Sequence, residues 1–245
     1  MISGTPTTAG TFNGTITAAN GTLPNAAQAF SIVISAPGGP FVSDDFTSGS
    51  LDTPPWTFVD PKGDSAAVVL GDVLLISVPA GVEHPLLPSE KRAARVMQSV
   101  GNTDFEVEVK FNSAPSQQYQ EQGVIVDQDG NNYLAFEVYS DGSVVYALVR
   151  NVAGPNSTDI TLPTIVGGPL LAGQANYYLR VGRVGNAWTF EYSYDGTAWV
   201  TAASFTQSLT VGGIGVYAGN ESGATSPAFT VLVDYVLNTA TPVAP

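Results

Sequence analysis

The chain has 245 residues, 44% hydrophobic and only 12% charged, with a formal net charge of −13. A surface this acidic repels phosphate backbones, so we expect no nucleic-acid partner. The absence of cysteine excludes disulfides and thiolate zinc sites, and the single histidine excludes metal sites that need three imidazoles.

The composition favours strands joined by turns, because glycine (26 residues) and proline (17 residues) are abundant beside Thr, Ser, Val and Ala. No apolar run reaches the roughly 18 residues of a membrane span, so no membrane partner is expected. Met1 precedes a polar segment without the basic and apolar regions of a signal peptide, and we interpret it as a start placed within a longer protein. The low charge and the Thr, Ser and Gly content lead us to expect a secreted or cell-surface bacterial protein.

The first part of the chain, residues 1–36, predicts two or three strands around a turn. "TFNGTITAA" and "AFSIVIS" alternate in polarity on either side of a segment rich in Gly and Asn. The run "ISGTPTTAGTF" resembles the last strands of the immunoglobulin-like repeats of bacterial surface proteins, and a linker follows at 37–42. So short a segment cannot bury a core, and we expect it to dock on the following domain or on another copy of the chain. The docking residues would be Phe12, Ile16, Phe30, Ile32 and Ile34.

Residues 43–238 predict an all-β, two-sheet antiparallel sandwich, and residues 239–245 a C-terminal linker. "DFEVEVKF" and "NYLAFEVY" place apolar side chains on one face of each strand and mostly polar ones on the other. "YYLRVGRV", "AWTFEYSY", "GGIGVYAG" and "FTVLVDYV" continue as strands. No segment keeps a helical period for more than two turns, which favours stacked sheets.

The order of these segments resembles a known family. "SDDFTSGSLDTPPWTFVDPKGD", "DFEVEVKF", "YQEQGVIVDQDGNNYLAFEVYSDG" and "YLRVGRVGNAWTFEYSYDGTAW" are similar to a laminin-G-like domain of the concanavalin A-like lectin/glucanase superfamily. Within it, the chain looks like the sandwich appended to secreted bacterial polysaccharide-degrading enzymes, including the C-terminal sandwich of some xylosidases. The resemblance implies a jelly roll with one concave sheet that binds a polysaccharide or oligosaccharide.

Two short motifs invite other readings. "SYDGTAW" (193–199) is similar to the Asp-box of sialidase propellers, but no repeated blade accompanies it. "DQDGNN" (127–132) begins like a calcium loop, yet Val138 stands where the bidentate Glu is required. Asp-Gly supplies the positive φ of tight hairpins, so both motifs predict turns, with Trp199 packing back across the first.

The expected ligand surface centres on "NYLAFEVY". If Leu134, Phe136 and Val138 face the core, the residues between them face the opposite surface. Aromatic faces there would stack on sugar rings, while amide and charged groups fix hydroxyls. The candidate ligand-binding residues are Tyr133, Glu137, Tyr139, Gln120, Gln122, Tyr146 and Arg150, together with His84 and with Arg95 from the basic cluster Lys91, Arg92 and Arg95.

A non-catalytic carbohydrate-binding module is therefore the preferred interpretation, with two alternatives. Related laminarinase-like glycosidases carry Glu-x-Asp-x-Glu on one strand, but "EVEVK" places Lys110 at the acid/base position, where a carboxylic acid is required. If the chain is a glycoside hydrolase, its carboxylates would come from separate strands, as Glu121 and Glu137. The second alternative is an adhesive or spacer module without a glycan ligand.

A structural Ca²⁺ is the one cofactor that we expect. The first and last strands of a jelly roll usually pair, which would bring "SDDF" close to "VDYV". Neighbouring carboxylates repel unless a cation intervenes, and calcium prefers such oxygen ligands. The candidate ligands are Asp44, Asp45 and Asp234.

Overall fold

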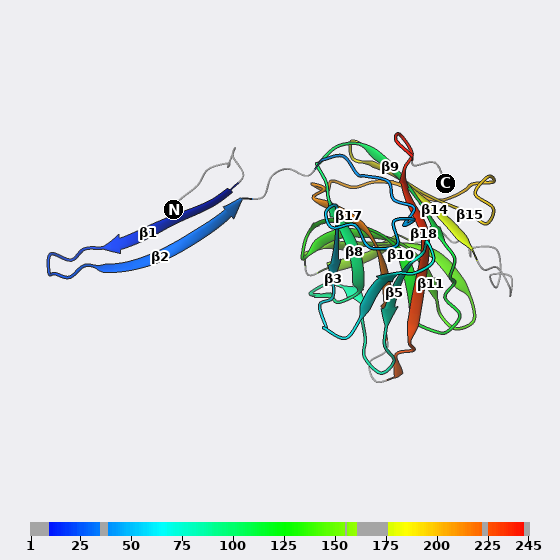
Figure 1. Ribbon diagram of the computed structural model, residues 1–245, viewed down its shortest axis with the longest axis horizontal. Helices are drawn as coiled ribbons and strands as arrows, with labels where there is room; N and C mark the ends of the chain where they lie inside the picture. The colour runs from blue at the N-terminus through cyan, green and yellow to red at the C-terminus, as the bar shows by residue number, and fades with distance from the viewer. Residues whose placement is uncertain (1–9, 35–38, 155, 161–175, 222–224, 243–245) are drawn as a thin grey trace. The chain divides into compact units, whose positions relative to one another are not determined.

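The computed structural model describes residues 10–34, 39–154, 156–160, 176–221 and 225–242, and the chain divides into two compact units, residues 1–38 and 39–245 (Figure 1). The regular elements of both units are β-strands, numbered in Figure 1, so the predicted all-β class is confirmed. None of the described segments is a helix long and apolar enough to cross a membrane.

The first unit is a β-hairpin of β1 (Gly10–Ala18) and β2 (Ala26–Ile34). Its register pairs Phe12 with Ile32 and Gly14 with Phe30, so the apolar side chains share one face. The ring of Phe30 lies over Gly14, where a Cβ would come within 2.5 Å of it. Phe12, Ile16, Phe30 and Ile32 are 36–57% exposed, while the side chain of Ile34 lies outside the described residues. The expected docking of this face stays a prediction.

The second unit is a two-sheet antiparallel sandwich, as predicted, and each sheet has seven strands among the described residues. Sheet I contains, in spatial order, β13 (Asn156–Ile160), β12 (Val145–Ala153), β11 (Asn132–Ser140), β10 (Gln120–Asp129), β17 (Gly213–Asn220), β8 (Ala94–Ser99) and β3 (Trp56–Val59). Sheet II contains β16 (Val200–Thr206), β15 (Ala187–Ser193), β14 (Tyr177–Val184), β9 (Phe105–Phe111), β18 (Phe229–Asn238), β5 (Leu74–Val78) and β4 (Ala66–Val69).

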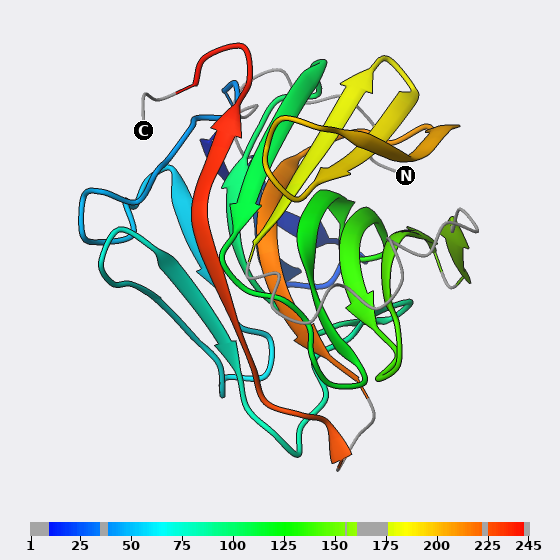
Figure 2. The same cartoon turned by 90° about the vertical axis from the view of Figure 1, so that its right-hand side faces the viewer.

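All strand pairs in both sheets are antiparallel, and the pairing is far from sequential. In sheet I, β10 lies between β11 and β17; in sheet II, β9 lies between β14 and β18, and Figure 2 shows β18 (red) beside β9 (green). The chain therefore crosses repeatedly between the sheets, which is the jelly-roll arrangement expected from the sequence.

The main core fills the space between the sheets. Leu134, Phe136 and Val138 on β11 are buried there, which confirms the predicted inward face of this strand. The ring of Phe136 lies 5.9 Å from that of Trp188 on the opposite sheet, measured between centroids. Aromatic contacts of this kind add to the stabilisation from apolar burial.

A second apolar cluster lies on the outer face of sheet I. Residues 84–93, here called the covering segment, fold over this face and contain the short strands β6 (Leu86–Leu87) and β7 (Glu90–Lys91). Leu86 and Ala93 are fully buried in it. Their partners on sheet I are Ile125, Tyr133, Ala135, Val152 and Tyr217. One part of the outer face of sheet I is thus sealed from solvent.

The Asp-Gly motifs form hairpin turns, as predicted. In "SYDGTAW", Asp195 Oδ1 accepts hydrogen bonds from the backbone N–H groups of Thr197 and Ala198, and Gly196 has φ +73°. Asp129 closes the turn between β10 and β11 by accepting the N–H of Asn131. Trp199 packs back onto β14, with its ring 3.8 Å from the Arg180 guanidinium.

Candidate functional site

A line of glycines shapes the outer face of sheet I along β17. Every second residue of "GGIGVYAG" faces outward, and three of these four, Gly213, Gly215 and Gly219, lack a side chain, with Tyr217 as the exception. Neighbours fill two of the gaps, because a Cβ at Gly215 would lie 2.5 Å from Met97 Sδ and one at Gly219 would lie 2.3 Å from Glu121 Oε1. At Gly213 the atom nearest to an added Cβ would be 3.4 Å away, so the outer face of the sheet stays open there.

The covered end of this face holds a buried ionic network. Arg150 Nη2 lies 3.2 Å from Glu137 Oε1 and 3.9 Å from Glu121 Oε2, while Nη1 lies 2.8 Å from Glu221 Oε1. Glu121 and Glu137 are fully buried, and Arg150 is nearly so. The structure therefore brings together two carboxylates from separate strands, as the hydrolase alternative requires, but places both under the covering segment.

The surrounding carboxylates favour the charged form of Arg150. Burial by itself would lower the pKa of Arg150, but the carboxylates of Glu137, Glu121 and Glu221 outweigh burial and raise the pKa. Burial, with the adjacent Glu137, raises the pKa of Tyr217 well above its usual value. The guanidinium therefore stays protonated and the phenol stays neutral at any ordinary pH.

The open end of the outer face is a groove of about 310 Å³. Gly212 and Gly213 line it beside Asp127 of β10. The rest of its lining includes Thr57 and Val59 from β3, and Arg95, Met97 and Ser99 from β8. This combination of a few polar groups with short apolar surfaces is typical of small-ligand sites.

Three charged groups meet between the groove and the covering segment. Lys91 Nζ pairs with Asp127 Oδ2 and lies 4.9 Å from the centre of the Tyr133 ring. Arg95 Nη1 donates to the Ala93 carbonyl at 2.9 Å. Burial raises the pKa of Asp127, against the effect of Lys91 and Arg95, and burial lowers the pKa of both cations. Among the described residues, Asp127 Oδ1 is buried without a hydrogen-bond partner.

The tyrosines of the expected ligand surface do face outward from sheet I. Tyr133 is nevertheless fully buried, and its hydroxyl donates to the Leu87 carbonyl at 3.2 Å. The expectation that Tyr133 is exposed is therefore wrong, because the covering segment lies on it. Tyr139 is half-buried and its ring centroid lies 6.5 Å from that of Tyr146, which donates to Asp141 Oδ2 at 2.5 Å.

Gln120 and Gln122 lie on the inner face of β10, opposite to the expected surface. Gln122 accepts from Ser113 Oγ at 2.7 Å and donates to the carbonyl of the same residue at 2.8 Å. Gln120 accepts from the backbone N–H of Ser116 and donates to the Ala228 carbonyl. Both amides satisfy buried polar groups inside the sandwich, which corrects their assignment as ligand contacts.

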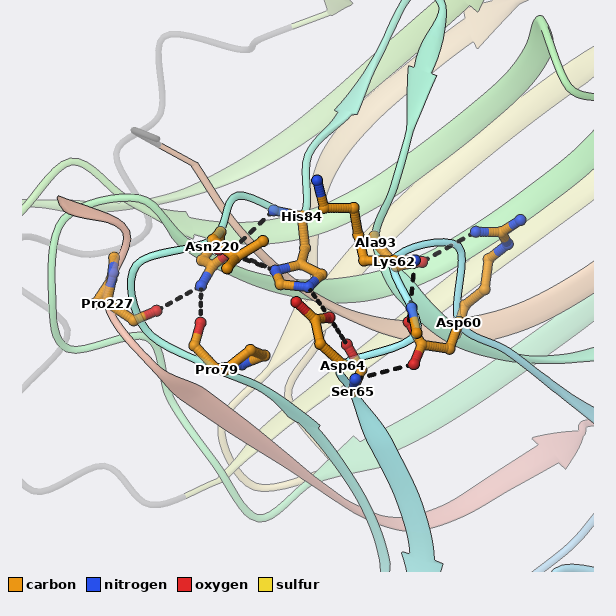
Figure 3. A network of polar contacts seen from close by, with 12 residues as sticks. Asp60, Lys62, Asp64, Ser65, Pro79, His84, Ala93, Asn220 and Pro227 are labelled. Atoms are coloured by element: carbon orange, nitrogen blue, oxygen red, sulfur yellow. Dashed lines mark hydrogen bonds and ion pairs between the residues drawn. The ribbon is translucent and has the colours of Figure 1, made fainter. Parts of the chain in front are cut away.

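His84 anchors the start of the covering segment (Figure 3). The ring is fully buried, with Nε2 2.8 Å from Asp64 Oδ1 and Nδ1 3.0 Å from Asn220 Oδ1. Asn220 in turn donates to the carbonyls of Pro79 and Pro227. Because both ring nitrogens face acceptors inside the fold, the structure gives His84 an architectural role in place of the expected ligand contact.

The expected calcium ligands are engaged elsewhere. Asp44 pairs with Val236, so the first and last strands do meet, but Asp44 accepts the indole N–H of Trp56 at 2.6 Å. Asp45 accepts from the Thr47 side chain, and Asp234 pairs with Lys110 at 2.5 Å. In the described part of the chain, no three His, Cys, Asp or Glu residues are grouped as a metal site would require. These residues thus do not form the carboxylate group that was expected, and calcium binding stays a prediction.

The "EVEVK" strand, β9, has the charged outer face that its alternation indicates. Arg180 lies between its glutamates, 2.7 Å from Glu108 Oε2 and 3.8 Å from Glu106 Oε1. Lys110 continues the row through its pair with Asp234. Among the described residues, this surface is a row of ion pairs on sheet II.

The open groove was not identified from the sequence. Of its polar residues only Arg95 was a candidate; Asp127, Ser99 and Thr57 were not. Its one sequence signal is the alternation of glycines in "GGIGVYAG", which removes side chains from one face of a central strand.

Two stacked antiparallel sheets with non-sequential strand order define a concanavalin A-like jelly-roll sandwich. Residues 81–225 match the model of the beta xylosidase C-terminal concanavalin A-like domain (GH43_C2). The match covers more than half of the chain, and the chain belongs to this family. A comparison with curated protein sequences gives no significant match.

Solved structures with this fold include GH43 BlXynB from Bacillus licheniformis, at 15% identity and a TM-score of 0.61, covering 83% of this chain and 40% of that one. Xylan beta-1,4-xylosidase from Bacillus halodurans C-125 has 16% sequence identity and a TM-score of 0.61, and the match covers 85% of this chain and 41% of that one. LamAcat from Zobellia galactanivorans has 13% sequence identity and a TM-score of 0.53, and the match covers 81% of this chain and 96% of that one. The chain thus spans about two fifths of the length of the two Bacillus proteins, and at these identities the likeness concerns the fold.

Proposed function

We propose that this chain is a non-catalytic carbohydrate-binding module, and that it binds glycan in the groove at the open end of the outer face of sheet I. The observation that carries the proposal is the groove itself, in which Arg95, Asp127 and Ser99 stand beside the apolar surfaces of Val59 and Met97. Sugars present hydroxyls at their edges and CH groups on their faces, so a site of this composition complements a sugar ring. Membership of a family named for the C-terminal domain of beta xylosidases supports carbohydrate as the ligand.

The wider setting is part of the same proposal. We place the module in a secreted, multi-modular bacterial protein that acts on polysaccharide, with a laminin-G-like sandwich preceded by the end of an immunoglobulin-like repeat. Its partners are then a polysaccharide or oligosaccharide and the neighbouring modules of the same protein. The low charge and the resemblance of residues 1–36 to such repeats support this setting.

The test is affinity electrophoresis of the full chain through gels that contain a panel of soluble polysaccharides, followed by calorimetry with those that retard it. Gly213→Phe fills the groove from its floor, where no neighbouring atom lies closer than 3.4 Å to the added Cβ. We expect this variant to fold and to lose binding. Val184→Phe, at a position 73% exposed on sheet II, is the matched control and should bind normally. Retention on no polysaccharide would overturn the proposal in favour of an adhesive or spacer module.

A glycoside hydrolase is the second candidate, because Glu121 and Glu137 lie on adjacent strands and face the same guanidinium. Retaining glycosidases need two neighbouring carboxyl groups, and these two residues are diagonal neighbours across the strand pair. Both groups are fully buried, however, and Arg150 lies between them and the covering segment as a counter-ion. Release of reducing sugar by the wild type, abolished by Glu137→Gln, would establish this alternative.

A further inference from the structure

Arg95 stands apart from most of the cationic side chains of this protein. Lys91, Lys110, Arg150 and Arg180 each pair with a carboxylate within ion-pair distance. Within the described ranges Arg95 has no such partner, and its hydrogen bond from Nη1 to the Ala93 carbonyl leaves most of its donors uncommitted. The nearby Asp127 carboxylate favours the charged form of Arg95 but is itself paired with Lys91.

The charges around the groove balance locally, although the protein as a whole is strongly acidic. Lys91 and Arg95 are balanced by Asp127 and the nearby Asp129, while the chain as a whole carries −13. Arg95 lines the groove, whereas Lys91, 8% exposed, is directed toward Asp127 and the ring of Tyr133. A guanidinium with free donors matches the planar, bidentate geometry of a carboxylate better than it matches a neutral hydroxyl.

We propose that the groove recognises the carboxylate of a uronic acid residue carried on an otherwise neutral glycan. The proposal rests on the carbohydrate-binding function proposed above and names the ligand class of that site. Arg95 receives the carboxylate, Ser99 and Thr57 at the groove wall contact ring hydroxyls, and Met97 and Val59 contact the CH surface. A volume of about 310 Å³ is at the small end of ligand sites, so the groove holds a branch or terminal sugar and leaves the main chain outside.

The net charge of the protein favours a glycan with an isolated uronate over a polyanionic glycan as the ligand. A chain of consecutive uronates would bring many negative charges near a surface that is itself strongly negative, and repulsion acts over about 10 Å at ordinary ionic strength. A single carboxylate gains the local attraction of Arg95 with much less of that repulsion. The expected order of affinity is therefore the singly charged glycan first, the neutral glycan second and the polyuronate last.

The test compares a xylo-oligosaccharide that bears one glucuronic acid branch with the same compound after reduction of its carboxyl group to an alcohol. Calorimetry of the full chain should show about tenfold to hundredfold tighter binding of the charged form, as expected for a charge-assisted hydrogen-bonded pair. Added salt should narrow this difference. Arg95→Gln should abolish the preference while binding of the reduced compound persists. Arg95→Lys keeps the positive charge but loses the planar, bidentate donors of the guanidinium. It should retain only part of the preference for the charged compound.

Arg180→Gln removes a cation from the outer face of sheet II and is the matched control; it should leave the preference unchanged. Equal binding of the charged and reduced compounds by the wild type would overturn this inference and leave the carbohydrate-binding function standing. Binding of neither, with no glycan of the panel retained, would overturn the function itself. Tighter binding of polygalacturonate, or equally tight binding of a glutamate-rich peptide, would also contradict an isolated uronate as the ligand.

Discussion

The hydroxyl of Tyr217 on β17 reaches across β10 to donate a hydrogen bond to Glu137 on β11. This contact exists because Gly123 lies between them, opposite Tyr217 on one side and Glu137 on the other. A side chain at Gly123 would occupy the path of the phenol and crowd the strand backbone, since its Cβ would lie 2.1 Å from the Phe136 carbonyl oxygen.

Gly123→Ala is therefore expected to destabilise the sandwich by about 1–3 kcal/mol, the usual cost of overpacking. Chemical denaturation, with the midpoint and slope measured separately, checks this value. Gly213→Ala on β17 is the matched control, because its added Cβ would make only ordinary contacts. Equal stability of the two variants would contradict the crowding inferred at Gly123.

Substitution of Tyr133 and of Tyr139 by alanine should lower the free energy of unfolding by different amounts, because Tyr133 is buried and Tyr139 is half-buried. Tyr133→Ala removes a fully buried ring from the second apolar cluster, so we expect a loss of about 3–5 kcal/mol. Tyr139→Ala, at a half-buried position, should cost about 1 kcal/mol, and melting by circular dichroism distinguishes the two. A Tyr133→Ala variant as stable as the wild type would mean that the covering segment does not pack on this ring.

The turn at Asp195 predicts a pH-dependent contribution to stability. Backbone hydrogen bonds from Ala198 and Thr197, with the side chains of Thr197 and Ser193, lower the pKa of Asp195 well below its usual value. A lowered pKa in the folded state means that the unfolded chain binds the proton more readily, so stability is present at neutral pH and lost as pH falls below about 4. Asp195→Asn should melt at a lower temperature than the wild type near neutral pH, and the difference should shrink in acid. A difference in melting temperature that stays constant with pH would show that the ionisation of Asp195 is not its cause.

Calcium binding is tested by thermal melting with and without chelator. A cation that binds only the folded state raises the melting temperature, so EDTA should lower it and calcium should restore it. Asp234→Asn should weaken the response if this carboxylate is a ligand, although the variant also loses the ion pair with Lys110. Lys110→Gln breaks the same pair without removing a carboxylate and is the control. An unchanged melting temperature and no metal by elemental analysis would remove the calcium proposal.

Deletion of residues 1–36 tests the docking expected of the N-terminal hairpin. A two-stranded hairpin with an exposed apolar face is marginally stable alone, so a docked hairpin should contribute to the melting temperature or to self-association. Sedimentation and calorimetry of the full and shortened chains measure both quantities. Identical values for the two chains would contradict docking.

The sheet architecture could be predicted because strand alternation is a local property. On β11 the apolar set Leu134, Phe136 and Val138 defines the inward face without knowledge of any partner strand. On β10 the same reasoning fails, because residues 120–126 are all buried and both faces of the strand lie against protein. Gln120 and Gln122 were consequently assigned to the wrong face, while Glu121 lies beside Glu137.

The covering segment and the groove depend on tertiary contacts that leave little trace in the sequence. β6 and β7 have two residues each, too few to show a period, so nothing local indicated that Leu86 would bury Tyr133. The groove joins Arg95, Asp127 and Gly213 from three strands whose order in sheet I differs from their order in the chain. The expected ligand surface centred on residues 132–139, which belong to sheet I, whereas the groove on the same sheet could be found only from the structure.

Burial of β10 and β11 on both faces has a consequence for the order in which the protein opens. Their amide hydrogens are screened by sheet II on one side and by the covering segment on the other, and flanking strands occupy both edges of the pair. Exchange with solvent deuterium at the centre of this pair then requires global unfolding, whereas the edge strands β3 and β4 exchange through local fluctuations. The slowest-exchanging amides of the molecule should thus lie directly beneath the covered half of the outer face of sheet I, giving the open half with its groove a rigid base.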